Sequence, residues 1–258
     1  MNVQPLASPA PAAHPPGRVP PVSGSAPDSA PQGLKQRLMR TAHTALEPMA
    51  ALLERLGLRA DHLTVLGLVF SLGAGLAFFE GWFRWGAGLV ALAGLCDLLD
   101  GQIARRAARE QGGTSRFGAF LDSTLDRLGE GMILAGLAGF YISSLVDLAL
   151  DPTLVAQQVE RGLEPRTWAA VALTAVVALV GSFVVSYTRA RAEGLGLECR
   201  VGWCERPERL GLLIVAGSFG VGPAMPAALM LLVILSFVTV AQRVAHVWKH
   251  TRAAGRDS

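Results

Sequence analysis

The sequence predicts an all-α integral membrane protein with six transmembrane helices and an N-terminal amphipathic helix at the membrane interface. Apolar residues make up 51% of the 258 residues and charged residues only 17%, below the roughly 25% of soluble domains. The apolar residues gather in runs of membrane-spanning length. The loops between these runs are alternately rich and poor in lysine and arginine. This composition excludes a disordered chain, and three cysteines are too few for a disulfide scaffold.

Four segments organise the chain. Residues 1–33 contain nine of the fifteen prolines and only two charges, which predicts a disordered Pro/Ala-rich tail. Residues 34–58 alternate basic and apolar side chains, which predicts an amphipathic interfacial helix. The six-helix membrane domain is expected over residues 59–250, and residues 251–258 form a polar tail.

The six spans are predicted from uncharged runs and from one break. Four runs lack charged residues: 63–79, 85–96, 131–146 and 167–188. The uncharged run 210–242 is too long for one span, and the glycines and prolines of residues 220–226 divide it into two helices. Aspartates follow the second run and precede the third, so these two helices carry carboxylates into membrane depth.

The distribution of lysine and arginine predicts the orientation. The segments before the first helix, between the second and third, between the fourth and fifth, and after the sixth are basic, whereas the other loops are poor in basic residues. Basic loops are retained on the cytoplasmic side. We therefore expect a multi-pass protein of the cell membrane with both termini and the active site on the cytoplasmic side.

Charged residues inside membrane spans are costly, so they indicate a functional site. After the second uncharged run, one helical face would carry Asp97, Asp100, Gly101, Ala104 and Arg105. At about 100° per residue these positions fall within an arc of about 140°. The small residues would let a bulky ligand approach the backbone, and the arginine would meet an anion such as a phosphate.

A second helix repeats the pattern. Gly118, Asp122 and Asp126 recur every four residues, so they share one side of a helix, and Glu130 extends the row. Four carboxylates that converge on one point require cations, and oxygen ligands suit Mg²⁺, Mn²⁺ or Ca²⁺. A purely structural alternative is that the aspartates pair with nearby arginines at the membrane edge.

These residues resemble the signature of the CDP-alcohol phosphatidyltransferase family, D-x-x-D-G-x-x-A-R followed by G-x-x-x-D-x-x-x-D, and every fixed position is present. The spacer between Arg105 and Gly118 has twelve residues, more than the family usually has. The family also starts its first helix with a polar motif, of which only Thr64 is kept here.

The resemblance implies a CDP-diacylglycerol donor with CMP as the leaving group, and a homodimer in the bilayer. It assigns two divalent ions, Mg²⁺ or Mn²⁺, to the aspartates Asp97, Asp100, Asp122 and Asp126. It further implies that Asp126 acts as the catalytic base. It also implies that the remaining signature residues line the CDP site: Gly101, Ala104, Arg105 and Gly118.

The acceptor alcohol is expected beside the basic loop between the fourth and fifth helices. Residues 186–193 and 205–210 resemble segments of bacterial phosphatidylinositol phosphate synthases, which implies inositol 1-phosphate as the acceptor. The resemblance places the acceptor phosphate among four arginines: Arg189, Arg191, Arg206 and Arg243. Arg209 is an equal candidate, and a phosphatidylglycerophosphate synthase that uses glycerol 3-phosphate is the alternative enzyme.

Two other classes compete with this interpretation. A membrane prenyltransferase would carry aspartate pairs in loops on more helices. A divalent-cation transporter would hold its site near the bilayer midplane, whereas these aspartates lie toward one side. No feature predicts a nucleic-acid partner, and Cys199 and Cys204 are interpreted as ordinary cytosolic thiols.

Overall fold

The computed structural model describes part of the chain, and all of its regular elements there are helices. The described residues are 46–111, 115–151, 153, 156 and 165–254. The predicted tail, residues 34–45 of the predicted amphipathic helix, and residues 255–258 lie outside the described part.

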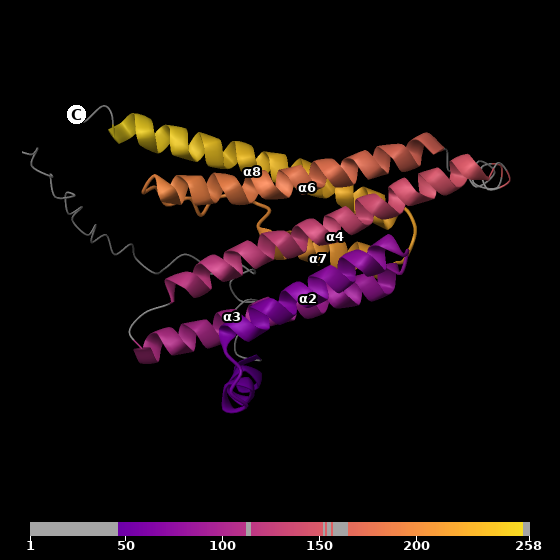
Figure 1. Ribbon diagram of the computed structural model, residues 1–258. Helices are drawn as coiled ribbons and strands as arrows, with labels where there is room; N and C mark the ends of the chain where they lie inside the picture. Colours follow the sequence, from indigo (N-terminus) through magenta and orange to yellow (C-terminus); the bar gives the residue numbers. More distant parts are fainter. Residues whose placement is uncertain (1–45, 112–114, 152, 154–155, 157–164, 255–258) are drawn as a thin grey trace, which may run out of the picture. The chain divides into compact units, whose positions relative to one another are not determined.

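A short helix over residues 46–55 precedes six labelled helices (Figure 1). Their bounds are α2 (Ala60–Phe79), α3 (Phe83–Gln111), α4 (Arg116–Leu150), α6 (Pro165–Gly194), α7 (Arg206–Ser218) and α8 (Ala224–Ala254). The all-α class is confirmed. The aspartate motifs lie within α3 and α4, as their spacing predicts.

Five of the described helices are long and apolar enough to cross a membrane: α2, α3, α4, α6 and α8. Helix α7 has 13 residues, which span about 20 Å, against a hydrocarbon core of roughly 30 Å. The break between the last two helices falls where the sequence predicts it, since Gly220 adopts a φ of 80° in the connection. The count of six spans stays a prediction.

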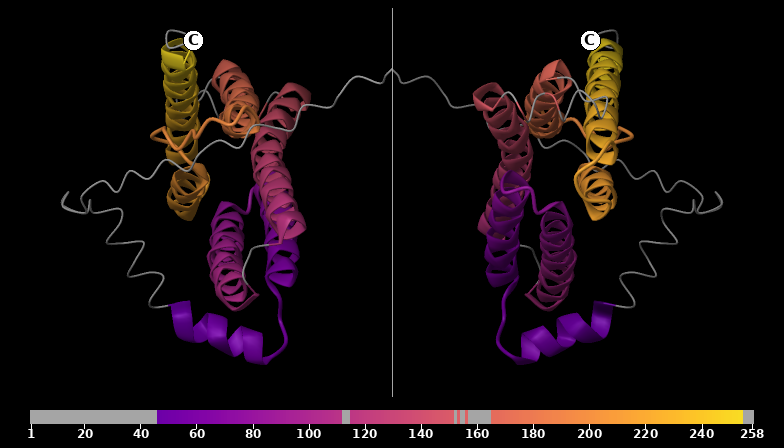
Figure 2. Two further views of the ribbon diagram at one scale, coloured as in Figure 1. Left: turned by 90° about the vertical axis from the view of Figure 1, so that its left-hand side faces the viewer. Right: turned by 90° about the vertical axis from the view of Figure 1, so that its right-hand side faces the viewer.

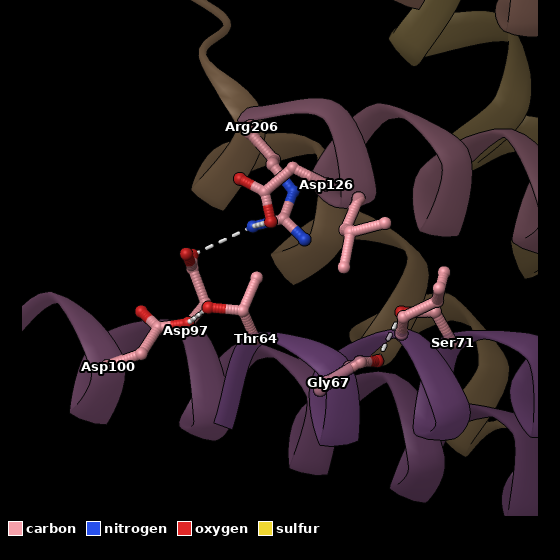
Figure 3. A pocket seen from close by; sticks show the side chains of 10 residues that line it. Thr64, Gly67, Ser71, Asp97, Asp100, Asp126 and Arg206 are labelled. Carbon is pink, nitrogen blue, oxygen red and sulfur yellow. Dashed lines mark hydrogen bonds and ion pairs between the residues drawn. The ribbon is translucent and has the colours of Figure 1, made fainter. Parts of the chain in front are cut away.

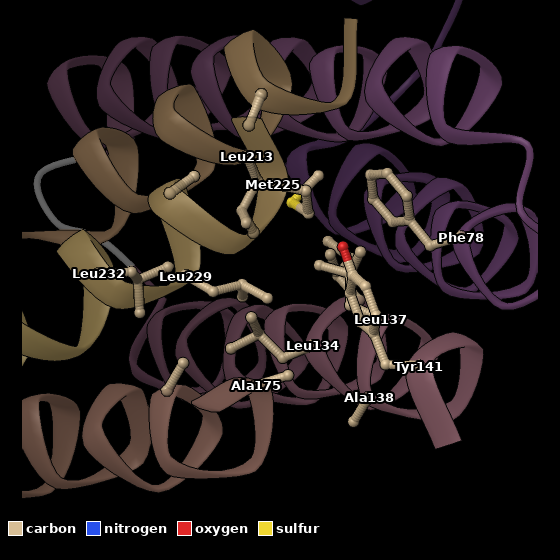
Figure 4. Close-up of a cluster of buried hydrophobic side chains, with 14 of the residues drawn as sticks. Phe78, Leu134, Leu137, Ala138, Tyr141, Ala175, Leu213, Met225, Leu229 and Leu232 are labelled. Atoms are coloured by element: carbon tan, nitrogen blue, oxygen red, sulfur yellow. The ribbon is translucent and has the colours of Figure 1, made fainter. Parts of the chain in front are cut away.

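The helices pack as a closed ring. Helix α2 packs on α3 and α4, α4 on α6, α6 on α8, and α7 closes the ring against α8 and α3. Every one of these helices contributes buried side chains to one core, where Phe78, Leu137, Leu213 and Met225 meet (Figure 4). Since lipid is as apolar as these side chains, their packing rather than the hydrophobic effect holds the ring together.

Helices α2 and α4 approach each other closely at two glycines. A Cβ at Gly75 would lie 2.5 Å from the carbonyl oxygen of Met132, and a Cβ at Gly136 would overlap the carbonyl group of Gly75. Small residues allow such close backbone contact between membrane helices. This crossing fixes α4, which carries Asp122 and Asp126, against α2.

The helix over residues 46–55 lies across the direction of the long helices (Figure 2). Its Ala50 is fully buried in a cluster with Leu63, Leu99 and Ile103. Arg106 of α3 pairs with Glu54 at 3.1 Å and with Glu47 at 3.3 Å. This part of the predicted interfacial helix is therefore attached to the bundle on one side.

Candidate active site

Three carboxylates converge between α3 and α4. One oxygen from each of Asp97, Asp122 and Asp126 lies within 4.8 Å of the others. Asp100 lies one turn along α3 from Asp97 and is 5% exposed. The structure thus brings the four aspartates of the two sequence motifs to the facing sides of two helices.

Thr64 of α2 orients Asp100. Its hydroxyl donates to Oδ2 of Asp100 at 2.9 Å and also lies 3.1 Å from the carbonyl oxygen of Ala60 (Figure 3). A buried carboxylate needs such donors, because an unsatisfied buried polar group is costly. This contact of Thr64 is not predicted from the sequence, where the available signal is a hydroxyl near the start of an apolar span.

The donor set fits a divalent cation. Oδ1 of Asp122 is buried and accepts no hydrogen bond within the described part of the chain. An unpartnered carboxylate oxygen beside two further carboxylates is an unfavourable arrangement that a hard cation relieves. Asp97, Asp122 and Asp126 could hold Mg²⁺ or Mn²⁺, whereas Asp100 is not among these three and accepts a hydrogen bond from Thr64.

Arg206 lies between the carboxylates of α3 and α4. Its Nη1 is 2.8 Å from Oδ2 of Asp97 and 2.9 Å from Oδ1 of Asp126 (Figure 3). Arg206 is predicted at the acceptor phosphate, and that role stays a prediction. The structure adds contacts from Arg206 to two of the aspartates of the sequence motifs, because the first turn of α7 lies beside both carboxylates.

Two cavities meet at Asp126 and Arg206. The smaller, of about 10 Å³, has room for about one water molecule and is lined by Thr64, Ser71, Asp97 and Asp100 as well (Figure 3). The larger cavity measures about 200 Å³, and we name it the arginine cavity. Its lining includes five arginines: Arg127, Arg189, Arg206, Arg209 and Arg243. Arg127 is predicted only as a possible ion-pair partner of the aspartates, and the structure places it in the lining of this cavity.

The predicted acceptor arginines differ in their surroundings. Arg189 lines the cavity while its Nε contacts Glu193 at 2.9 Å. Arg243 is 2% exposed, and it donates from Nε to the carbonyl of Val201 at 2.9 Å and from Nη1 to the carbonyl of Val185. Arg243 therefore ties the loop before α7 to α6 and α8 as well as lining the cavity.

Two arginines do not fit a phosphate-binding role. Arg191 is exposed and is not among the residues that line the arginine cavity. It lies two positions after Arg189 on α6, and residues two apart in a helix lie on roughly opposite sides. Arg209 is 1% exposed and forms an ion pair with Glu130. The alternative that Arg209 binds the acceptor is not supported by this geometry.

The four predicted CDP residues lie on the facing ends of α3 and α4. The guanidinium of Arg105 lies over Gly101, where a Cβ would be 3.2 Å from its Nη1. Gly118 donates its N–H to the hydroxyl of Ser115, which caps α4, at 3.1 Å. Ala104 is half-buried on the same face of α3. The long spacer is partly helical, because α3 continues through Gln111 before residues outside the described part.

Comparison with known proteins agrees with this site. A family model described as CDP-alcohol phosphatidyltransferase matches residues 58–251. The archaetidylinositol phosphate synthase of Methanothermobacter thermautotrophicus is 36% identical over 80% of this chain and 90% of its own length. The phosphatidylinositol phosphate synthase of Streptomyces avermitilis is 36% identical over 81% of this chain and 80% of its own length.

Solved structures of a relative are also similar. The Mycobacterium tuberculosis phosphatidylinositol phosphate synthase in complex with manganese and citrate is 34% identical, with a TM-score of 0.61, over 78% of this chain and 88% of that chain. The same enzyme with CDP-DAG bound gives a TM-score of 0.60 and 34% identity, over 78% of this chain and 92% of that chain.

Proposed function

This chain belongs to the CDP-alcohol phosphatidyltransferase family, and from that membership we propose that it transfers a phosphatidyl group from CDP-diacylglycerol to inositol 1-phosphate and releases CMP. It is a membrane-embedded transferase of phospholipid biosynthesis. Because of this family membership, we favour the phosphatidyl transfer over the transporter and prenyltransferase alternatives.

One observation carries the proposal: Asp126 belongs both to the carboxylate cluster and to the lining of the arginine cavity. A donor diphosphate held at the carboxylates and an acceptor phosphate held by the arginines would meet at this side chain. Two anionic substrates need separate positive sites on either side of the reacting atoms, and this arrangement supplies them.

We assign the chemistry to Asp126 as the general base. The acceptor hydroxyl oxygen forms a bond to the phosphorus that carries diacylglycerol, the bond from that phosphorus to the oxygen of CMP breaks, and the hydroxyl proton passes to Asp126. Two divalent cations, when bound, would supply positive charge for the diphosphate and the departing CMP. Their proposed ligands are Asp97, Asp100, Asp122 and Asp126, and the proposed CDP-binding residues are Gly101, Ala104, Arg105 and Gly118.

The acceptor follows from the arginine cavity together with the relatives. Arg189, Arg206 and Arg243 bring three guanidiniums to one cavity, and guanidinium groups suit a phosphate. The similar enzymes named above are inositol phosphate lipid synthases. Glycerol 3-phosphate carries the same phosphate, so it is the second candidate acceptor.

The membrane arrangement is part of the proposal. The basic loops favour a site and both termini on the cytoplasmic side of the cell membrane. CDP-diacylglycerol would then enter from the bilayer, and the polar acceptor from the cytoplasm. We also propose a homodimer, as the family resemblance implies.

The test is CMP release by the purified protein with CDP-diacylglycerol, Mg²⁺ and a panel of acceptors: inositol 1-phosphate, glycerol 3-phosphate, inositol and serine. We expect release with inositol 1-phosphate, lost in Asp126→Asn. Asp147→Asn is the matched control, because Asp147 is an exposed aspartate near the other end of α4, and it should keep full activity.

The other outcomes discriminate between the parts of the proposal. Release with glycerol 3-phosphate alone would replace the acceptor. Release with an unphosphorylated alcohol would contradict the role of the arginine cavity. A folded protein that releases no CMP with any acceptor, with either Mg²⁺ or Mn²⁺, would refute the proposed reaction.

A further inference from the structure

A buried ion pair joins α4 to α7 at the wall of the arginine cavity. Nε of Arg209 lies 2.5 Å from Oε1 of Glu130, and Nη2 lies 2.8 Å from Oε2. Arg209 is 1% exposed and Glu130 2% exposed. The guanidinium therefore binds the carboxylate through two parallel hydrogen bonds, the geometry with the greatest directional specificity.

Stability alone gives a poor reason for this pair. Removing two charges from water is expensive, and replacing a buried ion pair by apolar side chains of similar volume is often neutral or stabilising. Glu130 and Arg209 line the arginine cavity, but Leu134 of α4 and Leu213 of α7 belong to the apolar core, so apolar side chains of similar volume could extend that core. The ion pair fixes the distance and angle between α4 and α7, and apolar side chains would not fix them in this way.

The position of the pair indicates what it fixes. Glu130 follows Asp126 by one turn on α4, and Arg209 follows Arg206 by three residues on α7. The pair therefore stacks behind the contact between Asp126 and Arg206. Helix α7 packs chiefly on α3 and α8, so the pair is a direct polar link from α7 to the helix that carries Asp126.

Arg209 also holds the chain on the other side of Arg206. Its Nη1 donates to the carbonyl oxygen of Cys204 at 3.1 Å, and the N–H of Cys204 donates to the hydroxyl of Thr239 at 3.1 Å. One guanidinium thus fixes the residues before and after Arg206. Each of the three guanidinium nitrogens already donates one of these hydrogen bonds, which fixes the orientation of the side chain.

We infer that Glu130 and Arg209 are positioning residues that hold Arg206 at Asp126 and at the entrance of the arginine cavity, without contacting the acceptor themselves. The inference rests on the proposed function. Loss of the pair should displace Arg206 and so impair use of the phosphorylated acceptor, whereas the donor, held on α3 and α4, should bind as before.

Glu130→Gln gives the sharpest test, because electrostatics and positioning predict opposite results. Removing a negative charge from an arginine-lined cavity would strengthen phosphate binding if charge alone mattered. If the pair positions Arg206, kcat/KM for inositol 1-phosphate should instead fall by about 10²-fold, the loss expected from a displacement of about 1 Å. The KM for CDP-diacylglycerol should stay unchanged.

A second variant separates positioning from folding. The double variant Glu130→Met with Arg209→Met replaces the pair by apolar side chains, so it should keep a melting temperature close to the wild type and still lose acceptor efficiency. The matched control is Glu54→Gln, which breaks an ion pair with Arg106; neither residue lines the arginine cavity, so this variant should change neither KM.

Hydrogen exchange gives a readout that does not depend on activity. The backbone amides of α7 from Arg209 onward should exchange faster in both pair variants, while those around Asp126 keep their protection. Unchanged exchange of the α7 amides in the pair variants would overturn the inference, whether or not the proposed reaction is correct. Tighter acceptor binding in Glu130→Gln, equal loss for donor and acceptor, or full acceptor efficiency in the Met pair would overturn it as well.

Discussion

Replacing Gly75 with alanine should push α2 and α4 apart at their closest crossing. The added Cβ would lie 2.5 Å from the carbonyl oxygen of Met132. Real Cβ atoms essentially never come within 3.0 Å of such an atom, so the helices must separate by about half an ångström or more. The obstacle is backbone, which has no alternative rotamer, and Gly136 makes the same close contact from the other helix.

The magnitude follows from two opposing terms. Forcing an extra methyl into a packed interface costs about 1–3 kcal/mol, and the rigid carbonyl places this site at the upper end. Alanine returns about 0.5–1 kcal/mol relative to glycine within a helix. The net loss is then about 2 kcal/mol, which for a chain of this size lowers the melting temperature by roughly 4–8 °C.

The assay is thermal unfolding of the purified protein in detergent, with Gly88→Ala as the control. Gly88 lies within α3, and a Cβ there meets nothing within 4 Å, so the control should match or slightly exceed the wild type. CMP release below the melting temperature should also fall for Gly75→Ala, since α2 carries Thr64 and α4 carries Asp126. A Gly75→Ala protein as stable as the Gly88→Ala control would refute the close crossing.

Three further perturbations test other parts of the structure. Thr64→Val removes the hydrogen bond to Asp100, so it should weaken Mn²⁺ binding in a titration and lower the free energy of unfolding by about 1–3 kcal/mol. Thr64→Ser keeps the hydroxyl, so it should retain both the Mn²⁺ affinity and the stability. Burial raises the pKa of the Cys204 thiol, so less thiolate is present near neutral pH; alkylation followed by mass spectrometry should be slow and should accelerate as the pH rises, and rapid labelling of the folded protein would contradict this. Arg106→Gln removes partly exposed ion pairs, including that with Glu54, so it should cost at most about 1 kcal/mol, and a larger fall in melting stability would count against that estimate.

The sequence predicts the parts of the site that helical geometry determines. Asp97 and Asp100 lie on one helix face and Asp122 and Asp126 on another because positions three and four apart share a side. The glycines and prolines of residues 220–226 divide the last apolar run for an equally local reason. Each of these predictions needed only the spacing of residues within one segment.

Other parts of the site depend on which helices become neighbours. Arg206 and Arg209 have the same side chain and lie three residues apart, yet Arg206 lies between two active-site aspartates and Arg209 pairs with Glu130. Local pattern cannot separate them, because the difference arises when α7 closes the ring against α3 and α8. The burial of Ala50 against α2 and α3 is long-range in the same way.

The closure of the ring by α7 has a consequence for biogenesis. The chain is made from its N-terminus, so the ribosome delivers all four aspartates of α3 and α4 to the membrane before it has translated Arg206. During that interval the carboxylates of Asp97 and Asp126 lack the guanidinium that lies between them in the finished protein. In a nascent chain that ends in α6, these carboxylates therefore need another source of positive charge or hydrogen bonds, such as water or bound cations.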